Sequence, residues 1–473
     1  MKRYILGLIG LVVLFLPFQE AYGERVLQYG ARPGGRVFAG AGGPNPDFWV
    51  LKSGNTSVQS GAGGLGAGDF VRAGTMATRV NPTTWLVEAV GAGVARIEAP
   101  GTPKVWSLLL EPASTNLFIK SRDFNDAAWV KLAGDSINNN GAVGVDGTSV
   151  ADGYIGDAGN EVHMVYQSVQ QADIADNIPF CGSLYAKTGT HSWLQLQLRT
   201  QDNTQTDLFF DLGSGIKGVQ SLIAAPDAAG IEAIGNDWYR CWICDADSGS
   251  ITVSAVLFAR PSDSDGDNVT TGDGASVMIW IDGAQMEELP YPSSLVITDA
   301  AAVARTSEDP ADTNGLTYNI PTALFSGAGK GTAVVWFWSP YGKGVWATTV
   351  ASRTPIFNTH AGDSGQLYID TTGVITSNDQ TTAVTTATSM VTGWNMAAVK
   401  WNYDSGGAKF KVGLDNGTGF SWGVQGAYDG AFSETAGKIE FGRTMDVPIR
   451  VVDLMIWKTF ISESDIRDLG GPQ

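Results

Sequence analysis

Few side chains in this 473-residue chain have the types and spacing that catalysis needs. Glycosidases built on β-sandwiches usually place two carboxylates two residues apart on one strand, as acid and nucleophile. Asp453 lies in a strand-like stretch, but neither residue two positions away is acidic. His163, His191 and His360 are scattered, and the chain has no HExxH or GxSxG motif to support them. The sequence therefore predicts no catalytic residues and a protein that is not an enzyme.

The three cysteines form no convincing metal or redox site. Cys241 and Cys244 make a CxxC pair, which in other settings binds zinc or exchanges electrons. Their segment, WYRCWIC, has the composition of a strand, where side chains at odd separation point to opposite faces. The two thiols therefore cannot hold one ion. We expect buried free cysteines, with a disulfide from Cys181 to one of the other two as the alternative.

One acidic loop is a candidate metal site. Asp263, Asp265 and Asp267 alternate with small residues, so their carboxylates could converge on calcium. An EF-hand is excluded, because the sixth and twelfth positions counted from Asp263 hold Asn268 and Gly274. An irregular structural calcium site and a solvated acidic turn remain the two alternatives, and no other cofactor is expected.

Binding is better supported than catalysis, because residues 193–199 alternate apolar and polar side chains as a half-buried strand does. Aromatic rings stack on the apolar face of a pyranose, while amides and guanidinium groups bond its hydroxyls. The candidate binding face is Trp193, Gln195, Gln197 and Arg199, joined by Trp280 if its strand lies in the same sheet. The alternative is a covered face with Trp193 simply packed. Tyr341 and Trp346 are candidates for an exposed rim, whereas Trp336, Trp338, Trp401 and Trp457 are expected in a core.

Composition favours an all-β fold. Sixty glycines, few charged residues and many aromatic residues suit short strands joined by tight turns, and the length suggests about three domains. We expect two β-sandwich (jelly-roll) domains in tandem, at 119–290 and 316–473, with a linker at 291–315. In the second, 393–402 should pair with 409–414, and Ser462 should cap a short terminal helix. Residues 24–118 are predicted to hold a Gly-rich N-terminal arm, up to about residue 69, and then a segment with the pattern EPxxTNL.

The N-terminus has the layout of a secretory signal. Lys2 and Arg3 precede an apolar run, and small residues follow at 21–23. We interpret residues 1–23 as a signal peptide, with a retained membrane anchor as the alternative. The remaining chain would carry 28 basic and 47 acidic residues, a net charge of −19. Such a chain is repelled by phosphate backbones, so no nucleic-acid partner is expected.

Three stretches resemble known families. The segments FVRAGTMATRV (70–80) and LLLEPASTNLF (108–118) occur in the order found in phage tail and virion-surface proteins. The ending GAQME (283–287) is similar to that of carbohydrate-binding jelly-roll modules. The order of segments over the last 80 residues resembles concanavalin A-like domains of the laminin G and pentraxin type.

These resemblances imply a non-enzymatic structural or adhesion protein of a virion or cell surface, placed on the virion or outside the cell. Its partners would be a cell-surface glycan or other virion and surface proteins, and fibre-like relatives suggest a homo-oligomer. A signal peptide is unusual for phage proteins and favours a bacterial surface adhesin. The alternative is a secreted polysaccharide-degrading enzyme with an accessory binding module.

Overall fold

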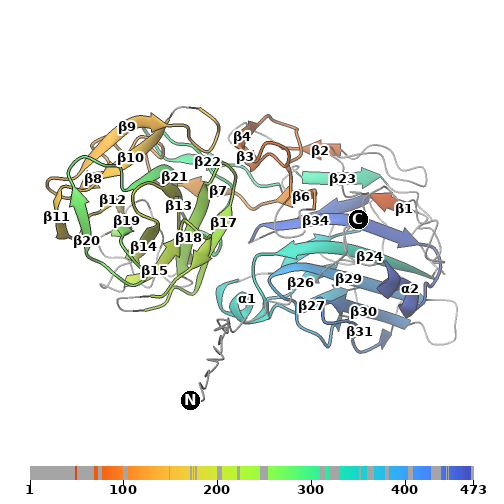
Figure 1. Cartoon of the computed structure of the whole chain (residues 1–473). Coiled ribbons are helices and arrows are strands. Elements are labelled where there is room, and N and C mark those ends of the chain that lie inside the picture. Colours follow the sequence, from red (N-terminus) through yellow and green to blue (C-terminus); the bar gives the residue numbers. More distant parts are fainter. Residues whose placement is uncertain are drawn as a thin grey trace, which may run out of the picture.

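The computed structural model shows two β-sandwiches side by side (Figure 1). It describes residues 48–50, 69–72, 77–99, 105–148, 150–170, 173, 175, 178–199, 205–220, 224–245, 254–308, 315–319, 330–350, 353–359, 367–378, 383–402, 409–427, 438–443, 445 and 447–469. The only helices in these ranges are α1 (Lys343–Thr349) and α2 (Glu463–Asp468), and neither is long and apolar enough to cross a membrane. The all-β expectation is confirmed, whereas the expected signal peptide lies outside the described residues.

The first sandwich consists of two six-stranded sheets. The inner sheet, which faces the second sandwich, contains in order β17 (Ala228–Ala233), β18 (Tyr239–Asp245), β13 (Phe180–Thr188), β21 (Ile279–Glu287), β10 (Ala151–Ile155) and β9 (Ser136–Ala142). The outer sheet contains β16 (Ile216–Lys217), β15 (Gln205–Asp211), β14 (Trp193–Arg199), β19 (Ser254–Ser262), β12 (Val165–Gln170) and β8 (Val130–Lys131). A ribbon of β11 (Ala158–Glu161) and β20 (Thr270–Asp273) lies beside them.

The alternation read in β14 sets which face of the outer sheet is buried. Leu194, Leu196 and Leu198 are all buried in the core between the two sheets. Because successive side chains of a strand point to opposite sides, the polar residues between them lie on the face directed away from the second sandwich. The predicted strand and its alternation are confirmed, although its central polar residues are buried as well.

The second sandwich is built on a nine-stranded sheet. Its order is β31 (Phe420–Trp422), β30 (Lys409–Asp415), β29 (Gly393–Asn402), β24 (Lys330–Ser339), β34 (Ile449–Trp457), β6 (Ser107–Leu110) and β5 (Ile97–Glu98), with β1 (Phe48–Val50) on β34 and β32 (Gly426–Ala427) on β30. The opposing layer holds β2 (Asp69–Val71), β23 (Gly315–Asn319) and β33 (Lys438–Phe441), and β25 (Thr354–Phe357), β26 (Leu367–Ile369), β27 (Ile375–Asn378) and β28 (Ala383–Thr385). The expected pairing of β29 with β30 and the Ser462 cap of α2 are confirmed.

The expected N-terminal arm is wrong for β1, which lies within it, and the described residues from there to 118 also belong to the folded domains. Strands β1, β5 and β6 belong to the large sheet of the second sandwich, and Leu108 and Leu110 are buried in its core. The hairpin of β3 (Ala77–Val80) and β4 (Val87–Val90) also lies in this region. Strands β1 and β6 both pair with β34, hundreds of residues along the chain, so local periodicity gives no sign of these two pairings.

The expected linker is also wrong over residues 291–298, most of which are buried, and a strand follows them. Its strand β22 (Val303–Arg305) pairs with β7 (Ser114–Asn116). The fully buried Arg96 donates a hydrogen bond of 2.7 Å to Glu308 and another to Glu111. We call these residues, with Arg72 and Arg305, the buried ionic cluster; Arg72 lies 3.1 Å from Glu308, and Arg305 lies 3.5 Å from Glu111.

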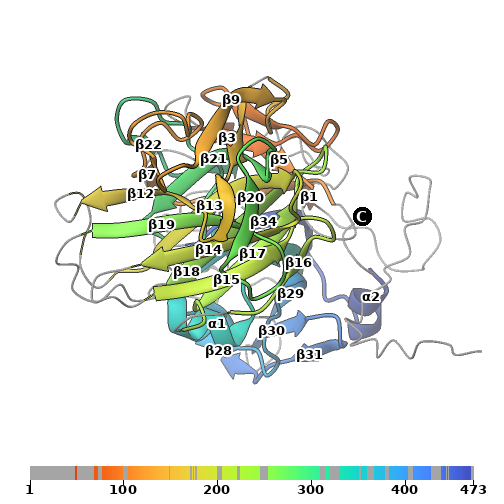
Figure 2. The ribbon, with the colours of Figure 1, turned by 60° about the vertical axis from the view of Figure 1, so that its left-hand side comes forward.

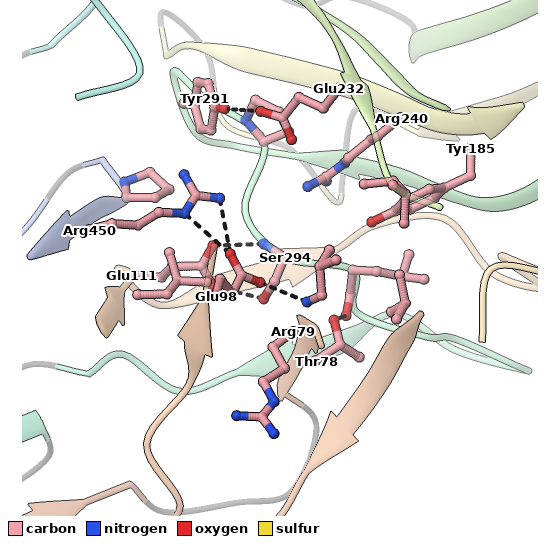
Figure 3. Close-up of a pocket in the computed structure, with 17 residues that line it drawn as sticks. Thr78, Arg79, Glu98, Glu111, Tyr185, Glu232, Arg240, Tyr291, Ser294 and Arg450 are labelled. Carbon is pink, nitrogen blue, oxygen red and sulfur yellow. Dashed lines mark hydrogen bonds and ion pairs between the residues drawn. The ribbon is translucent and has the colours of Figure 1, made fainter. Parts of the chain in front are cut away.

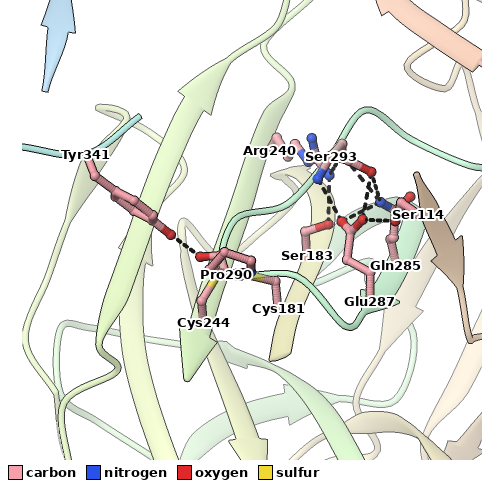
Figure 4. Close-up of a disulfide and its surroundings, with 10 residues drawn as sticks. All are labelled: Ser114, Cys181, Ser183, Arg240, Cys244, Gln285, Glu287, Pro290, Ser293 and Tyr341. Carbon is pink, nitrogen blue, oxygen red and sulfur yellow. Dashed lines mark hydrogen bonds between the residues drawn. A yellow bond between two sulfur atoms is a disulfide. The ribbon is translucent and has the colours of Figure 1, made fainter. Parts of the chain in front are cut away.

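A disulfide joins Cys181 and Cys244, which face each other on β13 and β18 (Figure 4). Cys241 is free and lies in the core of the first sandwich, whereas the disulfide lies on the opposite face of the inner sheet. The disulfide alternative is therefore confirmed, and so is the opposite orientation of the CxxC residues. Burial raises the pKa of the Cys241 thiol well above its usual range, which keeps it protonated and unreactive.

The buried ionic cluster predicts a loss of stability in acid. Burial alone raises the pKa of Glu111, but the charges of Arg96 and Arg305 outweigh burial and hold that pKa at about 2, against an ordinary 4.5. The stabilisation is complete above the unfolded-state value and is lost as the pH falls from about 5 toward 2. We expect Glu111→Gln to lower the free energy of unfolding at pH 7 by about 3–5 kcal/mol.

Urea denaturation from pH 7 to about pH 3.5 measures this effect, and the deficit of the variant should shrink as the pH falls. Asp299→Asn, which removes the exposed partner of Lys120, is the control and should leave the midpoint unchanged. A deficit that is the same at every pH would show that the charge of Glu111 does not stabilise the fold.

Candidate functional site

The outer face of the outer sheet carries a cluster of aromatic and guanidinium side chains. Tyr166 on β12 stands opposite Phe258 on β19, which stands opposite Gln197 on β14. Arg199 and Arg260 lie on the same face. We call Tyr166, Arg199, Phe258 and Arg260 the outer strip. Figure 2 shows the strands that carry it running side by side across the front of the first sandwich.

The outer strip is arranged around the ring of Phe258. The Tyr166 ring lies 5.0 Å from it, centroid to centroid, at an angle of 40°. The guanidinium carbons of Arg199 and Arg260 each lie 5.3 Å from its centroid, which is within cation–π range. Tyr166 and both arginines are half-buried, so each presents part of its surface to solvent. Burial lowers the pKa of Arg260, opposed by the nearby Asp207.

The candidate binding face on β14 was expected to be exposed. This is wrong for Gln195 and Gln197, which are 0% and 1% exposed. Gln195 donates a 2.7 Å hydrogen bond to Asp207 and accepts one from Arg260, and Gln197 bonds to Gln205. They hold the neighbouring side chains in place and are not available to a ligand.

Trp193 is half-buried against a loop. A Cβ added at Gly218 would lie 2.6 Å from its ring, so that glycine permits close packing. The alternative of a packed Trp193 therefore describes this end of the strand, and of the predicted face only Trp193 and Arg199 keep partial exposure.

Three further candidate residues lie elsewhere. Trp280 is on β21 of the inner sheet, so it does not share a sheet with Trp193. Tyr341 is 3% exposed and donates a hydrogen bond to the Pro290 carbonyl, and Trp346 on α1 is fully buried. The exposed rim expected at these two residues is wrong, because their segment packs between the sandwiches.

The core expected at four tryptophans is largely confirmed. Trp336, Trp401 and Trp457 are buried, and Trp338 is half-buried under the Arg450 guanidinium, 4.5 Å away.

The structure does not bring the carboxylates of the acidic loop together. Each has its own partner: Asp263 contacts His191 at 2.9 Å, Asp265 accepts the Val219 N–H at 2.8 Å, and Asp267 accepts the Val269 N–H at 3.0 Å. This arrangement is that of the solvated turn. Structural calcium stays a prediction that this loop does not support.

A different group does converge. Ligand atoms of Asp135, Asp157 and His163 all lie within 4.8 Å of one another. No sequence motif marks them, since they come from three separate loops. Asp135 is 1% exposed and accepts hydrogen bonds from Tyr154 and from backbone groups, so this carboxylate cannot reach a glycosidic bond as a catalytic acid.

A small polar pocket, with a cavity volume of about 30 Å³, lies at the junction of the two sandwiches (Figure 3). Most of its charges already have partners: Arg450 donates to Glu98 at 3.0 and 3.2 Å, and Tyr291 donates to Glu232 at 2.7 Å. Burial raises the pKa of the Tyr185 hydroxyl in its wall to about 12, so it remains a neutral donor. The pocket therefore resembles a structural junction more than a ligand site.

Comparison with known proteins adds little. No protein-family model and no curated protein matches the chain. The N-terminal CBM22-1–CBM22-2 tandem domain of Paenibacillus barcinonensis Xyn10C aligns with 73% of this chain and 98% of its own, at 11% identity and a TM-score of 0.22. Mouse laminin alpha1 LG4-5 aligns with 69% and 84%, at 10% identity and a TM-score of 0.15. Likeness this weak carries no argument about function.

The burial of Trp346 gives a direct test. We expect Trp346→Ala to lower the free energy of unfolding by about 3–5 kcal/mol, because it opens a cavity in the core. Phe460→Ala, which truncates an aromatic residue that is 43% exposed, is the matched control and should cost less than about 0.5 kcal/mol. Chemical denaturation measures the free energy of unfolding of both variants. Equal small losses would show that Trp346 is exposed, as the sequence predicted.

Proposed function

We propose that this protein is a non-enzymatic component of a virion or cell surface, and that it binds a glycan on the outer strip. The observation that carries the proposal is the half-exposed Tyr166 against Phe258, flanked by two guanidinium groups. A pyranose can stack on such a ring while the guanidinium N–H groups donate to its hydroxyls.

One property of the outer strip and one of the whole chain indicate which class of glycan could bind. Arg260 Nε has no hydrogen-bond partner among the described residues, so the free protein leaves this donor unsatisfied. The whole chain carries a net charge of −18, which repels anionic polymers at long range. The long-range repulsion favours a neutral glycan over an acidic one.

The surface role also rests on the phage-type segments. Residues of 108–118 connect the two sandwiches: Glu111 accepts from Arg96, the Pro112 carbonyl accepts from Arg305, and Asn116 donates to two carbonyls near the end of the first sandwich. This is an architectural role. It suits a protein whose two domains must keep a fixed relation while attached to a larger assembly.

Glycan-array binding followed by titration tests the proposed site. Tyr166→Ala and Arg199→Ala should each weaken binding of a neutral glycan by about tenfold or more, because each removes a central contact. Phe460→Ala is the control on the second sandwich and should bind as the unmodified chain does. Unchanged affinity in both strip variants would remove this face from consideration.

A separate experiment tests the proposal that the protein is not an enzyme. Incubation with a panel of polysaccharides should release no reducing ends above the blank. Steady release that disappears when a single carboxylate is changed to its amide would favour the alternative of a secreted polysaccharide-degrading enzyme.

A further inference from the structure

We propose that Asp135, Asp157 and His163 bind a divalent transition-metal ion of the zinc class at the rim of the first sandwich. Asp135 lies between β8 and β9, Asp157 between β10 and β11, and His163 between β11 and β12. Their ligand atoms lie within 4.8 Å of one another. The ion would tie three loops together and is independent of glycan binding on the outer strip.

His163 is buried and lies close to both carboxylates. Its side chain is 1% exposed, and its Nδ1 lies 2.8 Å from Asp135 Oδ1 and 3.7 Å from Asp157 Oδ1. Its Nε2 is buried and has no hydrogen-bond partner among the described residues. Nδ1 of this buried ring therefore faces both carboxylates, so the three groups could share one ion.

Asp157 supplies an independent observation. Its Oδ1 is closed to solvent and accepts no hydrogen bond from any described residue, although a buried carboxylate oxygen normally has a donor. A cation beside it satisfies this oxygen. Zinc–ligand bonds of about 2.0–2.2 Å place tetrahedral ligand atoms about 3.3–3.6 Å apart. The two distances from His163 Nδ1 to the carboxylates, 2.8 and 3.7 Å, bracket that range.

The backbone around the site is shaped for close approach. A Cβ at Gly134 would lie 2.2 Å from Asp157 Oδ2, and one at Gly156 would lie 2.9 Å from the His163 ring. Gly134 also has φ +99°, which favours glycine. Tyr154 donates to the other oxygen of Asp135 and orients it, as supporting residues do around metal ligands.

The ligand set selects the ion. One imidazole nitrogen with carboxylate oxygens suits zinc and similar transition metals, whereas calcium and magnesium prefer oxygen ligands alone. Among the described residues, the only ion-pair partner of Asp135 and Asp157 is His163. The carboxylates therefore have no fixed lysine or arginine that would compete with a metal.

Isothermal titration of Zn²⁺ into the chelator-treated full-length protein tests the proposal. We expect a single ion per chain with a Kd of roughly micromolar or tighter, and binding of Ca²⁺ at least about a hundredfold weaker. Asp157→Asn should weaken Zn²⁺ binding at least about tenfold. Asp237→Asn is the matched control, because that carboxylate is exposed and lies elsewhere.

His163→Gln provides the second variant, and Co²⁺ provides a spectroscopic signature. The visible absorption of bound Co²⁺ should change in His163→Gln, and melting curves show whether each variant is folded. Absence of Zn²⁺ binding overturns the proposal. So does equal affinity in folded Asp157→Asn, or Ca²⁺ bound as tightly as Zn²⁺.

Discussion

The relation between the two sandwiches depends on the buried guanidinium of Arg96. It bonds to Glu111, which precedes the first sandwich, and to Glu308, which follows it. The segment that leads into the first sandwich and the segment that follows it are therefore joined through the same guanidinium. Arg96 also holds both segments beside the second sandwich. Removing Arg96 would leave buried carboxylates without their main partner, and this usually costs far more than an exposed ion pair contributes.

The two sheets of the first sandwich differ in what they contact. The inner sheet carries the Cys181–Cys244 disulfide and Trp242, which pack in one cluster with Tyr291 and the second sandwich. The outer sheet makes no such contact through its described residues and carries the outer strip. The proposed binding face therefore lies on the sheet that does not pack against the second sandwich.

Local rules of sequence predicted local structure. The alternation at 193–199, the pairing of β29 with β30 and the Ser462 cap depend on neighbouring residues, and the structure bears them out. Burial of Gln195 and Trp346 depends on loops and segments far along the chain, so pattern alone gave them the wrong exposure. The Asp135 group was invisible for the same reason, because three loops assemble it. The outer strip needed the register of three strands, which sequence does not supply.

The first sandwich has two groups of clustered acids, and their partners differ. Arg122 donates to both oxygens of Asp282 at 2.7 Å and also bonds to Asp146. Burial raises the pKa of Asp146, but Arg122 outweighs it and holds the value at about 2. Here the chain supplies its own cation. At Asp135 it supplies only an imidazole, which is a weaker base than guanidine and a better metal ligand. That contrast within one domain is why the Asp135 group, and not the Asp282 group, is the place where a metal ion belongs.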